Sequence, residues 1–425
     1  GQGVPEHTAI EQITLLQTAP EVGHAAPRLQ APGGEARPVA PRRGRRIALA
    51  ALGVAAVALV GLAAFRFWPS RAHTPPSVRL GIAHGTEKDA WLAWAVEEFA
   101  KTPGGRGVTV ELLPMGSQRG ARAILSGDRR IHVWFPASSV YEGQFKAQWL
   151  AAYHTKPVLK QEDIALTPMV FIVWQECYEA LRDKYKALTF ATLKTALQEK
   201  DGWETIAGKA EWGKFLFGLA DPEDSNCGLV NLLLMAQEFH KKEQALTLAD
   251  VNKEDFQTWL HAIKATATPA RDSASMMREM TVKGPARYDV VCTYECLAIR
   301  YLKNAEDRWE SLHVEYPTVN LWNDNTYYVL NVPWGTPDTR RAAEAFMKFL
   351  LSEQAQKKAL TFGFRPANPD VPMRFPESPF ELYAKYGLKL DVPVVCETPK
   401  DEVLDALLTT WKKGPHSAPI LLDEP

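Results

Sequence analysis

The sequence predicts an α/β protein of two lobes, preceded by a single transmembrane helix. From Val78 onward, short strand-like apolar runs alternate with segments of helical periodicity, an order typical of sheets covered by helices. The chain has 425 residues, which is long enough for two such lobes. Before them, an uninterrupted apolar run extends from Ile47 to Phe65, close to the ~20 residues that cross a bilayer as a helix.

The body of the chain divides into buried strands and amphipathic helices. We expect strands at Val78 to Ala83, Val108 to Leu113, Ile131 to Phe135, Met169 to Trp174, Tyr288 to Thr293 and Thr326 to Leu330. Helical patterns occupy Trp91 to Phe99, Phe190 to Gln198, Gly228 to His240, Phe256 to Ala265 and Ala342 to Leu351. This alternation predicts parallel-rich sheets with helices on both faces.

Composition separates the N-terminal part from the rest. Residues 1–46 are rich in Ala, Pro, Gly and Gln with few aromatics, so we expect a disordered segment. Residues 47–68 form the predicted transmembrane helix, and residues 69–77 a Pro-containing linker. Arginines are concentrated before the span, which places the N-terminus in the cytoplasm and the C-terminal domain in the periplasm or outside the cell. The protein is therefore expected to be a single-pass protein of the inner membrane, with a cleaved signal peptide as the alternative.

Charge and motif content exclude several functional classes. The formal net charge of −1 provides no basic surface for nucleic acid. The ten histidines show no metal-ligand spacing, and no nucleophile elbow, Walker loop or dinucleotide fingerprint is present. We therefore expect no catalytic residues, no metal and no cofactor, and hence a protein that is not an enzyme. Five cysteines are too few for a disulfide scaffold. Cys292 and Cys296, the closest pair in sequence, are too far apart along a strand for a bridge unless the backbone turns between them, so we expect free buried thiols.

Polar residues stand where helices begin after predicted strands. Thr86 follows the first strand, Ser117 follows the second, and Ser225 with Asn226 follows an Asp-Pro turn. Backbone N–H groups at a helix start are unpaired and lie at the positive end of the helix dipole, so they suit a small polar or anionic ligand. The same residue types also cap helices without any ligand, so both interpretations stay open.

These residues carry a resemblance to a known family. The matching fragments are Leu80 to Thr86, Gly116-Ser117, Trp134 to Ser139, Asp221 to Gly228, Tyr294-Glu295, Tyr316-Pro317 and Gly363 to Asn368. In their order and spacing, they resemble the bacterial extracellular (periplasmic) solute-binding proteins of the type II fold. The resemblance is greatest to the family of the molybdate-binding protein, which is sometimes associated with von Willebrand A domains.

The resemblance implies two lobes joined by crossing strands, with a ligand cleft between them. Lobe 1 would comprise residues 78–168 and 319–425, and lobe 2 residues 169–318. In this family, hydroxyl groups and backbone amides at helix starts hold the ligand. The ligand-binding residues implied here are Thr86, Ser117, Ser225, Asn226, Tyr294 and Glu295.

Glu295 departs from the family pattern, because molybdate-type sites avoid carboxylates. An ionised carboxylate in the cleft would repel an oxyanion. Either Glu295 faces away from the ligand, or the ligand carries an amine.

The function that follows is capture of a small polar or anionic molecule by closure of the two lobes. Crossing segments around Thr167 to Trp174 and Pro317 to Asn325 are the expected hinge. The partner would be an ABC-type permease if the protein serves uptake, or a signalling partner if it serves sensing. A receptor or scaffold that binds a protein partner is the alternative, and an enzyme on the same fold is the least favoured interpretation.

Overall fold

A computed structural model describes residues 77–306, 308–392 and 394–415 of the chain. The predicted disordered segment and transmembrane helix, and nearly all of the linker, lie outside these residues. Within the described ranges, no helix combines the length and apolar character needed to cross a membrane.

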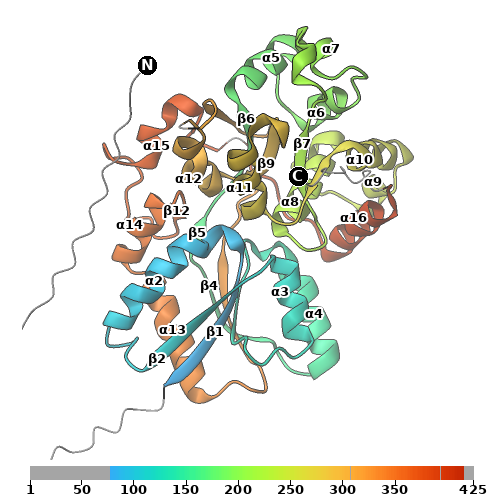
Figure 1. Ribbon diagram of the computed structural model, residues 1–425. Coiled ribbons are helices and arrows are strands. Elements are labelled where there is room, and N and C mark those ends of the chain that lie inside the picture. Colours follow the sequence, from blue (N-terminus) through green and yellow to red (C-terminus); the bar gives the residue numbers. More distant parts are fainter. Residues whose placement is uncertain (1–76, 307, 393, 416–425) are drawn as a thin grey trace, which may run out of the picture. The chain divides into compact units, whose positions relative to one another are not determined.

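The first sheet has the strand order β2-β1-β3-β11-β4. Its strands are β1 (Val78–His84), β2 (Val108–Pro114), β3 (Val133–Phe135), β4 (Val158–Asp163) and β11 (Thr326–Leu330). Four helices cover it: α2 (Asp89–Lys101), α3 (Ser117–Leu125), α4 (Glu142–Tyr153) and α13 (Pro337–Leu350). In Figure 1, α2 and α13 lie on one side of this sheet, and α3 and α4 lie on the other.

The second sheet has the strand order β10-β6-β9-β7-β8. Its strands are β6 (Met169–Trp174), β7 (Phe217–Ala220), β8 (Thr268–Ala270), β9 (Val290–Tyr294) and β10 (Leu312–Glu315). The helices that accompany it are α5 (Gln175–Tyr185), α6 (Phe190–Leu197), α7 (Trp203–Ala207), α8 (Asn226–His240), α9 (Leu248–Val251), α10 (Glu254–Thr266), α11 (Ser273–Lys283) and α12 (Glu295–Glu306). Helix α8 is buried over its first twelve residues, and a short turn connects it to β7.

The chain passes between the two sheets at the two segments expected to form the hinge. Thr167 and Asn323 form an antiparallel bridge there, and the Asn320 side chain bonds both the N–H and the C=O of Met169, at 2.9 and 2.8 Å. Beside them, β5 (Ala165–Leu166) pairs with β12 (Arg365–Pro366). The crossing point is thus fixed by side-chain amides, and hinge motion itself stays a prediction.

The remaining elements complete the body. They are α14 (Glu353–Thr361), α15 (Pro379–Leu382), α16 (Asp401–Lys413) and the 3-10 turns η1 (Thr86–Lys88), η2 (Ser139–Tyr141), η3 (Ala210–Trp212), η4 (Gly284–Ala286) and η5 (Ala384–Tyr386). Helix α16 packs against α8, α9 and α10, which accompany the second sheet. We expected residues 319–425, which include this helix, in lobe 1, but α16 packs on the lobe of the second sheet. The other lobe boundaries stay predictions.

The predicted α/β architecture with two lobes is confirmed, and in each sheet four of the five strands run in one direction while one strand is reversed. In the first sheet, β1 runs parallel to β2 and β3, whereas β11 runs antiparallel to β3 and β4. In the second sheet, β7 runs parallel to β8 and β9, whereas β6 runs antiparallel to β9 and β10. The reversed strands β6 and β11 are the ones that come directly from the crossing segments, so each enters its sheet from the opposite end.

Candidate ligand-binding cleft

Three helical segments begin at strand ends near the predicted site. Turn η1 follows β1, helix α3 follows β2, and helix α8 follows β7 after a short turn. No side chain caps α3 or α8, and the N-cap residue of α3 is Gly116, so Ser117 is the first helical residue and not the cap. Within the described residues, the first three backbone N–H groups of α3 and of α8 have no hydrogen-bond partner. Unpaired amides at a helix start can bind an anion or a polar acceptor, and of these six residues Arg119 is exposed while the other five are buried.

The starts of α3 and α8 lie against one another, although they follow strands of different sheets. A Cβ atom on Gly116 would lie 2.1 Å from the carbonyl oxygen of Asp224, so only glycine permits this approach. Arg122 of α3 pairs with the Asp224 carboxylate and donates to the carbonyl of Glu223 at 2.7 Å. The two lobes are therefore in direct contact at their helix starts.

Thr86 reaches the second lobe as well. Its hydroxyl donates to the Asp272 carboxylate at 3.3 Å. Asp272 caps α11 by accepting from the Ser275 N–H at 2.8 Å and lies 3.0 Å from Arg271. Burial opposes ionisation of Asp272, but these two interactions outweigh it and lower its pKa. No side chain caps η1, and Asp89 is the first residue of helix α2.

A cavity of about 130 Å³ opens where these segments meet. It is lined by Thr86, Pro114, Met115, Gly116, Arg119, Asp224, Arg271 and Asp272. Asp224 and Asp272 each have an arginine partner, in Arg122 and Arg271. The exposed Arg119 has no partner within the described part of the chain, so it contributes an uncompensated positive charge.

Asn226 connects both sheets to the crossing segment. Its Nδ2 donates to the Tyr294 hydroxyl at 3.1 Å and to Asn323 Oδ1 at 2.9 Å, and its Oδ1 accepts from the Ser138 hydroxyl at 2.9 Å. Asn226 and Tyr294 are both buried, and burial raises the pKa of Tyr294 well above its usual value. These two predicted site residues therefore hold the crossing region together in this conformation. Ser225 is buried beside them as the N-cap residue of α8.

Ser117 is also engaged within the protein. Its hydroxyl accepts from the Ala137 N–H at 3.1 Å, and its carbonyl accepts from Trp134 Nε1 at 3.2 Å. The next residue, Gln118, is buried and its side-chain amide has no partner within the described residues. Sequence reasoning missed Gln118, although its position in the first turn of α3 was a usable signal.

The carboxylate of Glu295 forms a buried ion pair with Arg365. Arg365 donates to its two carboxylate oxygens at 2.8 and 2.7 Å, and the Tyr316 hydroxyl donates to one of them. Glu295 and Arg365 are both buried. The carboxylate that distinguishes this chain from molybdate-type sites is thus neutralised by Arg365. Both of its oxygens therefore already accept hydrogen bonds from the protein, and a ligand-binding role of Glu295 stays a prediction.

A second buried ion pair lies closer to the helix starts, and sequence reasoning passed over it. Lys88 is fully buried and donates to Glu87, to the Pro136 carbonyl at 3.1 Å and to Asn325 Oδ1 at 2.9 Å. The charge of Glu87 contributes to the raised pKa of the Cys227 thiol, for which burial is the main cause, so this carboxylate acts near the start of α8. All five cysteines are buried and free.

The pKa values of His84 and Asp89, on either side of this pair in the sequence, are shifted from their usual values. Burial lowers the pKa of His84 to about 4. Burial raises the pKa of Asp89 to about 6, and Glu87 adds to that rise. Within the described residues, no group of three or more His, Cys, Asp or Glu side chains could hold a metal ion.

Comparison with known proteins places this geometry in a family. A sequence model of the family described as bacterial extracellular solute-binding protein matches residues 80–365, which is more than half of the chain. The chain belongs to this family. The predicted resemblance and the solute-binding function are thereby confirmed, and an extracytoplasmic location follows at the level of the family. The family comprises binding proteins, which fits the expectation that this member is not an enzyme.

Solved structures show the same fold at low sequence identity. A periplasmic thiamin binding protein has a TM-score of 0.54 at 13% identity, covering 79% of this chain and 96% of that chain. Iron-bound HitA from Pseudomonas aeruginosa has a TM-score of 0.52 at 16% identity, covering 78% of this chain and 99% of that chain. The sulfate-binding protein SubI from Mycobacterium tuberculosis has a TM-score of 0.51 at 17% identity, covering 75% of this chain and 93% of that chain. No curated protein matches the chain by sequence. At these identities, the likeness shows the type II fold alone.

Proposed function

We propose that this protein captures a small anionic or polar solute where the starts of α3 and α8 meet. The observation that carries the proposal is the set of unpaired amides at both helix starts, together with a nearby cavity lined by Gly116, the unpaired Arg119 and Asp224 of the turn before α8. Two lobes that contribute to one ligand gain binding energy only when closed, which is how capture would favour the closed form. In this role, Thr86 and Ser117 lie on one lobe, and Ser225 and Asn226 lie on the other.

The size of the cavity limits the solute. A volume of about 130 Å³ lies below the roughly 300–1,000 Å³ of ordinary small-molecule pockets. A compact solute such as an oxyanion or a short carboxylate fits this space better than a sugar or a nucleotide. A larger solute would require the contacts between Gly116 and Asp224 to open.

The experiment is a thermal-shift screen of the protein with oxyanions, amino acids, polyamines and sugars. A bound solute at a hundred times its dissociation constant should stabilise the fold by ~2.7 kcal/mol. Arg119→Gln should weaken binding of an anionic solute about tenfold, since a charge-assisted hydrogen bond is lost. Arg129→Gln, also exposed and without a partner among the described residues, is the matched control and should change nothing. Equal effects of both variants would place the solute elsewhere.

We further propose that residues 47–68 tether the domain to the inner membrane and that an ABC permease receives the solute. The apolar composition of this segment supports the tether, and membership of the family supports the permease. The protein should stay with the membrane fraction after alkaline extraction, and deletion of residues 1–68 should release it. Release of the undeleted protein by alkali would reject the tether.

A non-transport receptor that binds a protein partner is the second candidate. The direct contacts between the lobes at Gly116, Asp224 and Arg122 favour it, because protein groups themselves already join the two lobes there. The screen separates the two functions: a transport protein responds to a solute, and a receptor of this kind responds to none.

A further inference from the structure

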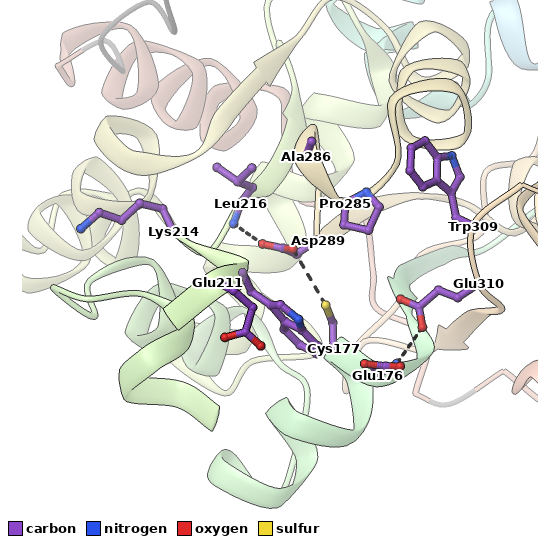
Figure 2. A pocket seen from close by; sticks show the side chains of 11 residues that line it. Glu176, Cys177, Glu211, Lys214, Leu216, Pro285, Ala286, Asp289, Trp309 and Glu310 are labelled. Atoms are coloured by element: carbon purple, nitrogen blue, oxygen red, sulfur yellow. Dashed lines mark hydrogen bonds between the residues drawn. The ribbon is translucent and has the colours of Figure 1, made fainter. Parts of the chain in front are cut away.

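We propose that a second cavity, on the lobe of the second sheet, binds a small organic cation. This cavity has a volume of about 590 Å³ and shares no residue with the cleft described above. Figure 2 shows its lining, which comes from the start of α5, turn η3, the residues before β7 and before β9, turn η4 and the segment before β10. The proposal concerns a site additional to the solute site and does not depend on it.

Two tryptophan rings form the aromatic part of the lining. The residue Trp309 is 51% exposed, and its Nε1 donates to the Thr281 carbonyl at 3.1 Å. Gly284 lies against the same ring, where a Cβ atom would come within 2.6 Å, so the indole is held in place. Trp212 packs edge-on against Trp203 with ring centroids 5.0 Å apart. A rigid, solvent-accessible indole is the side chain best suited to attract a cation through its face.

The protein already places one cation on this wall. The ammonium group of Lys209 lies 3.7 Å from the centroid of the Trp212 ring and 3.2 Å from the Glu176 carboxylate. Lys209 thus demonstrates the combination of aromatic face and carboxylate that an ammonium group prefers. Trp309, Glu211 and Glu310 line the same cavity, and among the described residues no lysine or arginine lies over the Trp309 ring.

The charge of the lining is negative. Glu211 has no partner within the described residues, and Glu310 accepts only the N–H of Glu176, at 3.4 Å. The single lysine of the lining, Lys214, directs its ammonium to the Lys200 carbonyl and away from the cavity. Burial raises the pKa of Glu310, and repulsion by Glu176 adds to the rise. A cation between these carboxylates would remove that repulsion, whereas an anion would increase it.

The volume defines the class of ligand. About 590 Å³ falls within the roughly 300–1,000 Å³ of small-molecule pockets and far exceeds the space of one bare ion. The apolar faces of Trp309, Pro285 and Ala286 require hydrocarbon contact in addition to charge. A protonated amine or a quaternary ammonium on a short carbon skeleton satisfies both requirements.

The test is calorimetric titration of the full-length protein with tetramethylammonium and with spermidine, and with sulfate as the anion of comparison. Both cations should bind at millimolar concentration or below, and salt should weaken their binding. The double variant Glu211→Gln and Glu310→Gln should weaken both cations by about tenfold or more. Trp309→Leu should affect tetramethylammonium more than spermidine, because a quaternary ammonium cannot donate hydrogen bonds.

Controls separate this site from the solute site. Glu204→Gln, an exposed carboxylate of α7 outside the cavity, should leave cation binding unchanged. Arg119→Gln should also leave it unchanged, since Arg119 lines only the other cavity. Absence of cation binding by the unaltered protein, or equal weakening by Glu204→Gln, would overturn the proposal. If the double variant does not fold, the exposed single variant Glu211→Gln gives the same comparison.

Discussion

Two buried ion pairs lie beside the residues that the sequence selected, and they differ in how completely their charges are satisfied. In the pair of Glu295 and Arg365, both carboxylate oxygens accept from the guanidinium, and Tyr316 donates as well. In the pair of Glu87 and Lys88, the lysine has three acceptors, but one oxygen of Glu87 has no hydrogen bond within the described residues. We call the first pair saturated, because both of its carboxylate oxygens accept hydrogen bonds, and the second pair unsaturated, because one carboxylate oxygen accepts none within the described residues.

This difference separates a structural role from a role near the ligand. Arg365 also donates to the Lys389 carbonyl at 2.7 Å, so the saturated pair fixes the C-terminal segment to the start of α12. The unsaturated Glu87 lies in η1, directly after Thr86, and its charge acts at Cys227 in the first turn of α8. A carboxylate in that position would oppose the anion that we propose the helix starts attract. Glu87, and not Glu295, is therefore the carboxylate that should influence the choice of solute.

The largest effect is expected from breaking the saturated pair. Arg365→Met should lower the free energy of unfolding by about 3–5 kcal/mol, because it leaves the Glu295 charge buried without a partner. The double variant Glu295→Leu and Arg365→Met should be more stable than the single one, since no charge is then left unpaired. Urea unfolding measures both. A loss below about 1 kcal/mol in the single variant would show that the pair is not desolvated as the structure implies.

A smaller effect is expected at the unsaturated pair. Glu87→Gln should cost about 1–3 kcal/mol, because Lys88 keeps the acceptors Pro136 O and Asn325 Oδ1. The same variant should raise the affinity for an anionic solute severalfold, since it removes a negative charge near the start of α8. Glu97→Gln, an exposed carboxylate of α2, is the control. Unchanged anion affinity in Glu87→Gln would mean that the two pairs do not differ in function.

The smallest expected effect is a shift in the pKa of Asp89. Burial and Glu87 raise the pKa of Asp89 from 3.8 to about 6, so the folded state holds this proton more tightly than the unfolded state does. The resulting stability is fully present below pH 3.8 and is lost as the pH rises through about 6. Glu87→Gln should shift the Asp89 titration, followed by carboxyl NMR, toward lower pH. The Glu295→Leu and Arg365→Met variant should leave it in place, and an equal shift in both variants would contradict the comparison.

Much of the architecture could be predicted because the signals were local. The expected strand Met169 to Trp174 is strand β6 without change, and the expected helix Gly228 to His240 differs from α8 by two residues at its start. Long apolar runs and helical periodicity are properties of single segments. The antiparallel strands and the position of α16 could not be predicted in the same way, because they depend on where the chain crosses between the sheets.

The candidate site, too, could be predicted only where the signal was local. The helix starts at Thr86, Ser117 and Asn226 were visible in the sequence, since polar residues after strands mark them. The residues that they contact were not visible in the sequence, because these partners lie far away along the chain. Asn226, for example, contacts side chains of both lobes and of the crossing segment. Glu295 was selected for its place after Tyr294, but its partner Arg365 follows it by 70 residues. No local pattern distinguishes a carboxylate that faces a ligand from one that meets an arginine.

The most direct test of the account is an NMR titration of backbone amides with the solute that stabilises the protein most in the thermal screen. The amides of the first turns of α3 and α8, from Ser117 to Arg119 and from Asn226 to Gly228, should show the largest shifts together. Shifts confined to one of the two helix starts, or found mainly elsewhere, would contradict capture of the solute between the lobes.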